Sequence, residues 1–276
     1  MKTVGVAILG LGVVGGGTYK ILTEHREFYR RTQNVDISVE CVLELNRQRA
    51  LDLGVEESRI CSNIAEVVSN PNVDIVVEVI GCKYWFELEK AAKRTNVGLY
   101  FEASCVGGVP IIRTLIDGMQ ANVVNNLTGI INGTTNYILT RMAREGLDYR
   151  EALKDAQALG YAEKDPTADV EGYDATYKLS ILASLAFHTK VPLDKIYREG
   201  ITDISRQDIA YGEELGYVLK LLAIGKNDGE GNIEVRVHPA FIRKDHPLAS
   251  VSDSFNAVFL KGDCVGDIML YGRGAG

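Results

Sequence analysis

The feature that most constrains the fold is a short apolar run, residues 4–9, that leads directly into the glycine motif G-L-G-V-V-G. Gly10, Gly12 and Gly15 have the spacing G-x-G-x-x-G. After a strand, the first glycine permits a tight turn, the second lets a pyrophosphate approach the backbone, and the third lets the following helix pack on the strand. The helix N-terminus then faces the anion. The sequence therefore predicts a dinucleotide-binding turn, with an unliganded glycine-rich turn as the alternative. The candidate cofactor-binding residues are Gly10, Leu11, Gly12, Val13, Val14 and Gly15.

Strand and helix patterns alternate through the first hundred residues, which predicts a parallel sheet with crossover helices. The remainder of the chain mixes helical segments with later strands, which predicts a second, mixed sheet. The fold class is therefore α/β: a Rossmann-like nucleotide-binding domain, residues 1–107, followed by an α+β domain, residues 108–276. Expected strands are 4–9, 37–43, 73–80, 98–102, 123–131, 217–224, 233–241, 257–261 and 267–271, and expected helices include 15–30, 85–94 and 111–120.

Composition excludes several other classes of protein. Of the 276 residues 46% are hydrophobic, enough for a sizeable core, and the net charge is −7 with no basic block. This balance argues against nucleic acid and anionic membrane as partners. The five cysteines are scattered without C-x-x-C spacing, so they read as reduced thiols, and the four histidines have no metal-binding spacing. The N-terminus enters a strand without a signal sequence and no segment has membrane-spanning length, so we expect a cytoplasmic protein.

An acidic segment, residues 161–178, is the second informative feature. It places carboxylates at Glu163, Asp165, Asp169, Glu171 and Asp174 ahead of Lys178. If this part is helical, Asp174 and Lys178 lie on one face, four residues apart. The alternative is an ordinary solvated ion pair, which contributes about 0.3–0.5 kcal/mol. The same face continues through apolar residues at 181, 182 and 185, which indicates a lysine that leads into a core.

Five segments, in order along nearly the whole chain, carry a family resemblance. They are G-L-G-V-V-G at 10–15, E-A-S-C-V-G-G-V-P-I-I-R at 102–113, I-N-G-T-T-N-Y-I-L at 131–139, G-Y-A-E-K-D-P-T-A-D-V-E-G-Y-D-A-T-Y-K-L at 160–179, and V-H-P-A-F-I-R-K-D-H-P-L-A-S-V at 237–251. Together they resemble the homoserine dehydrogenase family. The resemblance implies reduction of L-aspartate 4-semialdehyde to L-homoserine with NADPH or NADH, in the route to threonine, methionine and isoleucine.

The resemblance also implies roles for the acidic segment. Lys178 matches the family's proposed proton donor, and a cation there suits the alkoxide that forms when hydride reaches an aldehyde carbon. Glu163 and Asp174 match residues placed around the substrate's ammonium group. Asp169 either steadies Lys178 within this set or caps a helix, the cap being favoured. Asn132–Asn136 matches a polar loop that starts a helix near the substrate, for which a plain N-cap is the alternative.

Further expectations concern bound ions, the coenzyme and assembly. Glu102, Cys105, Gly107 and Val109 match a loop that binds a sodium or potassium ion, mainly through backbone carbonyls, with an ordinary turn as the alternative. Glu44, at the end of the second strand, favours NAD, whereas the nearby arginines at 47 and 49 favour NADP, and the sequence leaves this open. The family further implies a homodimer formed through the second sheet.

The chain departs from the family pattern in two places. The family has a helix and a strand ending in T-A-N-K before the helix that matches 85–94, whereas Gly81, Cys82, Lys83 and Tyr84 here run almost directly into it. A unit of roughly 20–30 residues is missing. We expect the crossover to close all the same, with Lys83 as the candidate for the lost lysine.

The second departure is Y-G-R-G-A-G at 271–276, where Arg273 replaces a family proline and no packing helix follows. This predicts exposed apolar surface and lower stability. The alternative function is a non-catalytic, nucleotide-binding homologue or partner subunit.

Overall fold

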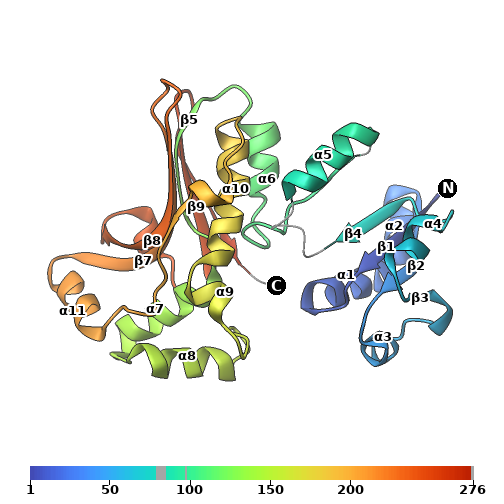
Figure 1. Ribbon diagram of the computed structural model, residues 1–276, viewed down its shortest axis with the longest axis horizontal. Helices are drawn as coiled ribbons and strands as arrows, with labels where there is room; N and C mark the ends of the chain where they lie inside the picture. Colours follow the sequence, from blue (N-terminus) through green and yellow to red (C-terminus); the bar gives the residue numbers. More distant parts are fainter. Residues whose placement is uncertain (79–84, 97, 275–276) are drawn as a thin grey trace. The chain divides into compact units, whose positions relative to one another are not determined.

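The computed structural model describes residues 1–78, 85–96 and 98–274 (Figure 1). The chain divides into two compact units, Met1–Gly81 and Cys82–Gly276. The boundary that we expect after residue 107 stays a prediction. In the described part of the chain, no helix is both long and apolar enough to cross a bilayer.

The first unit contains a parallel sheet, as the alternating pattern predicts. Its four strands have the order β3-β2-β1-β4, and every pairing is parallel. The central strands are mostly buried, because helices pack against this sheet. The strands are β1 (Lys2–Leu9), β2 (Val35–Leu43), β3 (Ile60–Cys61) and β4 (Ile75–Glu78).

The helix expected over 15–30 is instead two helices. α1 (Val13–Glu24) ends at His25, and α2 (Arg26–Gln33) follows directly. Two arginines of α2 bind the same carboxylate at the start of β2: Arg26 Nε lies 2.6 Å from Asp36 Oδ1, and Arg30 Nη2 lies 2.8 Å from Oδ2. These bonds hold α2 to the start of β2. The unit also contains α3 (Arg47–Asp52), η1 (Glu57–Arg59) and α4 (Ile64–Ser69).

The strand expected over 98–102 does not form, so that prediction is wrong. The second unit holds this segment instead: Phe101 contacts Trp85, with 6.2 Å between ring centroids, and the Glu102 carboxylate accepts the N–H groups of Ile112 and Arg113. The segment therefore lies in a turn before α6 (Ile111–Arg113), and a strand paired with β4 could not make these contacts. The expected parallel crossover is therefore absent among the described residues, and β4 is the edge strand of its sheet.

The second unit is built on a mixed six-stranded sheet with the order β10-β9-β5-β7-β8-β6 (Figure 1). Only β6 and β8 pair in parallel; the other pairs are antiparallel. The strands predicted here are confirmed within a few residues. They are β5 (Val124–Ile130), β7 (Tyr217–Asn227), β8 (Ile233–Arg243), β9 (Phe255–Gly262) and β10 (Gly266–Arg273), joined by the two-residue β6 (Tyr197–Arg198).

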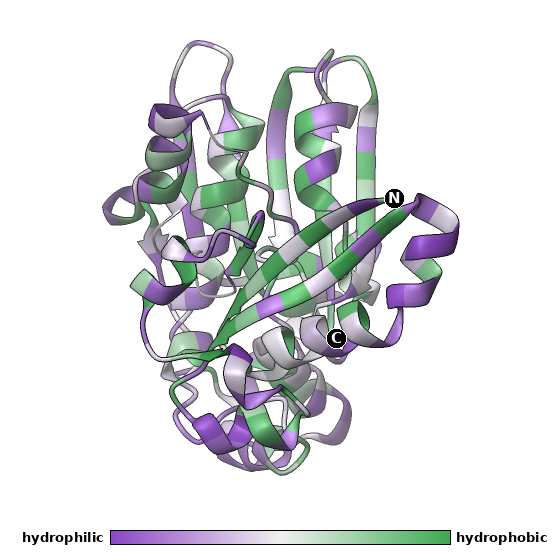
Figure 2. Ribbon diagram, turned by 90° about the vertical axis from the view of Figure 1, so that its right-hand side faces the viewer, coloured by the Kyte–Doolittle hydropathy of each residue, from purple (hydrophilic) through white to green (hydrophobic). Residues whose placement is uncertain are grey.

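Helices cover this sheet and enclose the main core. α10 (Tyr173–Ala186) contacts β5, β7 and β8, and Leu179, Ile181 and Leu182 on it are almost fully buried. Figure 2 shows apolar residues along the strands and alternating polar and apolar residues along the helices. The helix expected over 111–120 is α6 followed by a π-helical turn, η3 (Thr114–Gly118). The other helices are α5 (Trp85–Thr95), α7 (Gly133–Glu145), α8 (Tyr149–Ala158), α9 (Thr167–Val170), η4 (Leu193–Lys195), α11 (Arg206–Glu214) and η5 (Pro247–Ser250).

Candidate active site

The glycine motif forms the turn between β1 and α1 that its spacing predicts. Gly10 has φ +86° and donates its N–H to Leu43 O at 2.8 Å, which ties the turn to the end of β2. A Cβ at Gly15 would lie 1.9 Å from Gly10 O, so helix and turn need a glycine there. A Cβ at Gly12 would meet nothing within 4 Å, which leaves that side open to a ligand. Gly12 is also the N-cap of α1 and supplies no side chain, so no capping side chain binds the first-turn N–H groups.

Glu44 joins the glycine turn to the end of β2. Its Oε2 accepts the N–H of Leu11 at 2.7 Å, and its Oε1 accepts the N–H of Asn46 at 2.9 Å. Burial raises the pKa of this carboxyl, but the hydrogen bonds from Asn46 and Leu11 outweigh burial and hold the pKa below its ordinary value. Glu44 is therefore an anion at neutral pH, fixed where the carboxyl ends of β1 and β2 meet.

A separate cluster lies in the second unit, around the start of α10. Lys178 Nζ donates to Asp174 Oδ2 at 2.7 Å, which confirms that the two residues share one face of a helix. The same ammonium group donates to Ile131 O at 3.3 Å, and the Lys178 side chain is only 17% exposed. The amine is thus held against the protein and is not the freely solvated side chain of the alternative interpretation.

Asn132 connects this ion pair to a second carboxylate. Its Nδ2 donates to Asp174 Oδ2 at 3.0 Å and to Asp169 Oδ1 at 2.7 Å. Its Oδ1 accepts the N–H of Thr135 at 2.9 Å, so Asn132 is also the N-cap of α7. The N-cap expected in this loop is confirmed at Asn132, whereas the position of the loop near the substrate stays a prediction.

The two other acidic candidates have different surroundings. The cap role expected for Asp169 is wrong, because Pro166 and Gly172 are the N-caps of α9 and α10, and Asp169 lies inside α9. Burial, with the nearby Asp174 charge, raises the pKa of Asp169 against the hydrogen bond from Asn132. Glu163 is exposed in the loop before α9, where its backbone oxygen accepts from the Gln157 side chain. No contact between Glu163 and the ion pair is found among the described residues.

The loop expected to bind a cation has a constrained backbone. Val106 and Gly107 have φ +60° and +57°, and for a β-branched residue such as Val106 this conformation costs about 1–3 kcal/mol. Cys105 N–H bonds Glu102 O at 3.2 Å, and Ile111 N–H bonds Val109 O at 2.8 Å. Each carbonyl oxygen has a second lone pair, so these bonds leave capacity for an ion. Among the described residues, no group of three or more His, Cys, Asp and Glu side chains could hold a metal ion, and the cation site of this loop stays a prediction.

The missing T-A-N-K strand bears on one further candidate. Lys83 lies outside the described residues, so its role stays a prediction. Among the described residues, Lys178 is the lysine that pairs with Asp174 in the cluster.

A glycine turn that opens a helix on a parallel sheet, carried in one chain with a shielded amine bonded to a carboxylate, is typical of the class of nicotinamide-dependent oxidoreductases. The family model described as Homoserine dehydrogenase matches residues 110–276. The chain belongs to the homoserine dehydrogenase family, whose members are NAD(P)-dependent oxidoreductases.

Individual relatives agree with this assignment. The homoserine dehydrogenase of Bacillus subtilis is 40% identical over 305 residues, covering 100% of this chain and 70% of the relative, and that of Mycobacterium leprae is 42% identical over 306 residues, covering 100% and 69%. Both alignments are longer than the 276 residues of the chain, so each relative has residues without a counterpart here.

Solved structures agree as well. The crystal structure of a homoserine dehydrogenase from Thiobacillus denitrificans has a TM-score of 0.93 at 40% identity and covers 100% of this chain and 70% of that one. A hyperthermophilic archaeal homoserine dehydrogenase in complex with NADPH has a TM-score of 0.81 at 23% identity, covers 99% and 92%, and shows the shared fold.

Proposed function

We propose that this chain interconverts L-aspartate 4-semialdehyde and L-homoserine, with Lys178 as the group that exchanges the proton with the substrate oxygen. The observation that carries the proposal is the 2.7 Å bond between Lys178 Nζ and Asp174 Oδ2 on a mostly buried side chain. Asp174 and Asn132 orient the amine, and a shielded site strengthens its electrostatic effect on a developing alkoxide.

Lys178 acts as an acid in the reducing direction. A bound nicotinamide would supply the hydride that the aldehyde carbon gains, and the electron pair of the C=O π bond would move to the aldehyde oxygen. Lys178 transfers one proton from Nζ to that oxygen and becomes a neutral amine, which solvent protonates again. In the oxidising direction the neutral amine accepts the hydroxyl proton as hydride leaves the carbon. One lysine therefore serves both directions.

Charge balance supports substrate binding by the same cluster. Asp169 and Asp174 both contact the amide of Asn132, and Lys178 supplies one positive charge near these two carboxylates. The excess negative charge complements the ammonium group of an amino-acid substrate. Glu163 is exposed on the same acidic segment, and we place it with the substrate's ammonium group as a further carboxylate.

We further propose NADH as the preferred coenzyme. The Glu44 carboxylate is fixed beside the glycine turn, where an acidic side chain accepts the hydroxyls of the adenosine ribose and repels a 2′-phosphate. Of the two arginines that could favour NADPH, Arg47 already pairs with Glu57 at 2.9 Å. The archaeal relative was solved with NADPH, so the coenzyme has to be established for this chain.

A monovalent cation and a homodimer complete the proposal. The carbonyl groups of Glu102, Cys105, Gly107 and Val109 fit sodium or potassium by donor chemistry. Dimerisation through the six-stranded sheet is supported by partly exposed apolar side chains on the face of β8 and β10 that includes Ile242, Met269 and Tyr271, the last of which is 54% exposed.

The test is oxidation of L-homoserine by purified protein, followed as reduced nicotinamide forms with NAD or NADP. Wild type should turn over, and Lys178→Ala should lower kcat by about 10²–10⁴-fold, the range for a lost general acid or base. Lys164→Ala, an exposed lysine in the same acidic segment, is the matched control and should match wild type. Coenzyme binding without turnover in wild type would support the alternative, a non-catalytic nucleotide-binding protein or partner subunit.

A further inference from the structure

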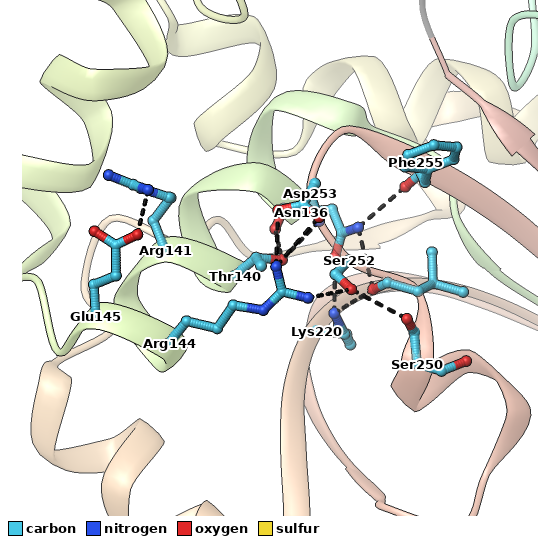
Figure 3. Close-up of polar contacts among 11 residues, drawn as sticks. Asn136, Thr140, Arg141, Arg144, Glu145, Lys220, Ser250, Ser252, Asp253 and Phe255 are labelled. Atoms are coloured by element: carbon cyan, nitrogen blue, oxygen red, sulfur yellow. Dashed lines mark hydrogen bonds and ion pairs between the residues drawn. The ribbon is translucent and has the colours of Figure 1, made fainter.

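Lys220 is a lysine buried in the apolar centre of the six-stranded sheet. It lies on β7 between Leu219 and Leu221, and the residue is only 3% exposed. Its ammonium group donates to Asn136 Oδ1 at 3.0 Å and to Val251 O at 2.5 Å (Figure 3). Burial of a cation destabilises the fold unless specific acceptors bind it. We therefore expect this lysine to have a role that an apolar residue could not fill.

The Lys220 bond determines the orientation of the Asn136 side chain. An ammonium group only donates, so it must face the amide oxygen of Asn136 and not the amide nitrogen. The nitrogen is thereby directed to two backbone oxygens of the loop after η5, Val251 O at 3.3 Å and Phe255 O at 3.0 Å (Figure 3). Reversing the amide would set two N–H groups against the ammonium and an oxygen against two carbonyls. Lys220 thus selects the one orientation in which Asn136 binds the loop.

The loop that Asn136 binds, residues 251–255, packs along α7 from its first residue, Gly133, to Arg144 in its last turn. A Cβ at Gly133 would lie 2.8 Å from Ser254 O, so the helix start and the loop are in close contact. Thr140 Oγ1 accepts the N–H of Asp253 at 3.1 Å, and Arg144 pairs with the Asp253 carboxylate at 3.2 Å (Figure 3). The loop and the helix start are therefore held as one piece.

This piece carries the N-cap that touches the catalytic cluster. Asn132 precedes Asn136 by one helical turn, and its amide donates to Asp169 and Asp174. A shift of the first turn of α7 would move that amide away from Asp174, which binds Lys178. The path from Lys220 to the reacting amine therefore runs through named hydrogen bonds.

We propose that Lys220 is a positioning residue for the reaction: by fixing the Asn136 amide it clamps loop 251–255 onto α7 and so holds Asn132 against Asp174 and Lys178. The proposal rests on the proposed function of that cluster. Its chemical requirement is an N–H donor at the end of a long side chain at residue 220.

The test compares Lys220→Met, which removes the donor, with Lys220→Gln, which keeps N–H donors on a shorter chain. Lys220→Met should lower kcat for homoserine oxidation by about 10–100-fold. The reason is that a displacement of about 1 Å of an active-site group lowers the rate by about this factor. The coenzyme KM should not change, and Lys220→Gln should recover a large part of kcat. Val124→Ala, a buried residue at the start of β5 and distant along that strand from Ile131, is the control: it should lower Tm and leave kcat unchanged.

Hydrogen exchange supplies a readout that does not depend on turnover. In Lys220→Met the backbone N–H groups of Asn136 and Asp253 should exchange faster, whereas in Val124→Ala they should stay protected. If Lys220→Met does not fold, Asn136→Asp keeps an acceptor for the ammonium but removes both N–H donors to the loop, and it should show the same two effects. The positioning role of Lys220 is overturned if any folded variant of residue 220 or 136 has unchanged kcat and unchanged hydrogen exchange. An inactive wild type overturns the proposed function instead. In that case the exchange rates alone decide whether Lys220 holds the loop on α7.

Discussion

Glu44 Oε2 accepts the backbone N–H of Leu11 at 2.7 Å, so the end of β2 and the glycine turn share one fixed carboxylate. The amide next to the turn's second glycine is therefore already engaged, and the charge beside it is negative. This relationship sets the electrostatic environment that a bound adenosine ribose would meet.

The first prediction concerns coenzyme choice. Wild type should have a higher kcat/KM with NAD than with NADP, because a 2′-phosphate would face the Glu44 carboxylate. Glu44→Gln keeps the shape and removes the charge, so it should shift the NAD-to-NADP ratio of kcat/KM toward NADP by about tenfold, or about 1.4 kcal/mol. Glu40→Gln, on the same strand, is the control. A wild type that prefers NADP would show that the arginines, and not Glu44, dominate this site.

The second prediction separates the charge of Asp174 from its shape. Asp174→Asn retains the volume but leaves Lys178 without its ionic partner, and the Asn132 amide would face another amide. We expect kcat/KM for homoserine to fall by about 10²-fold or more. Asp165→Asn changes an exposed carboxylate of the same segment, which accepts hydrogen bonds from Thr167, and should have no effect on kcat/KM. Equal activities of the two variants would remove Asp174 from the mechanism.

The third prediction separates the two roles of Asn132. Asn132→Ser keeps a good N-cap for α7, so the free energy of unfolding should change by only a few tenths of a kcal/mol. A serine cannot also reach Asp169 and Asp174, and kcat should therefore fall while stability is kept. Asn132→Ala loses both roles and should additionally lose about 1 kcal/mol of stability. Urea unfolding and steady-state kinetics on both variants provide the measurement.

The fourth prediction concerns pH and the buried lysine. Burial, with the Arg144 charge adding and the Asp253 charge opposing, lowers the pKa of Lys220 from 10.5 to about 8. Between these two pKa values the unfolded chain binds more protons than the folded chain. The free energy of unfolding therefore increases as pH rises. The gain should total about 3 kcal/mol and be complete above the unfolded pKa.

This contribution is isolated by comparison with Lys220→Met. The free energy of unfolding of wild type minus that of Lys220→Met should increase from pH 7 to pH 10, measured by urea unfolding at each pH. Other titrating groups cancel in the difference because both proteins share them. A difference that stays flat across this range would contradict a depressed pKa at Lys220.

The fifth prediction concerns the cation loop. An ion held by the folded loop alone stabilises the protein by mass action, by about 1.4 kcal/mol at ten times its Kd. Potassium or sodium chloride should therefore raise Tm above the value in tetramethylammonium chloride at equal ionic strength, since the larger cation cannot fit between carbonyls. Identical Tm values in all three salts would show that the loop is an ordinary turn.

Local patterns in the sequence predicted those parts of the fold that depend on neighbouring residues. The strand, turn and helix around Gly10 form as the glycine spacing requires, and Asp174 meets Lys178 because four residues make about one helical turn. The periodicity of 15–30 contains no sign of the break at His25, and the helix after it is held by a contact made ten residues along the chain, the pairing of Arg26 with Asp36.

Tertiary contacts decided the remaining features. The apolar residues of 98–102 suit a strand, but Phe101 packs on Trp85 and Glu102 caps α6, and these contacts prevail over local propensity. Lys220 could have been noticed as a single charge inside an apolar strand, yet its partner Asn136 is 84 residues distant in the sequence. No local pattern reveals which asparagine would receive that charge.

The edge strand β4 carries a practical consequence for anyone who concentrates this protein. Among the described residues it pairs only with β1, and Ile75 and Val76 on it are about half exposed. Unpaired backbone N–H and C=O groups beside exposed apolar side chains favour pairing with a strand of another molecule. Storage conditions, tags and crystallisation screens should therefore be chosen with self-association along this flank in mind.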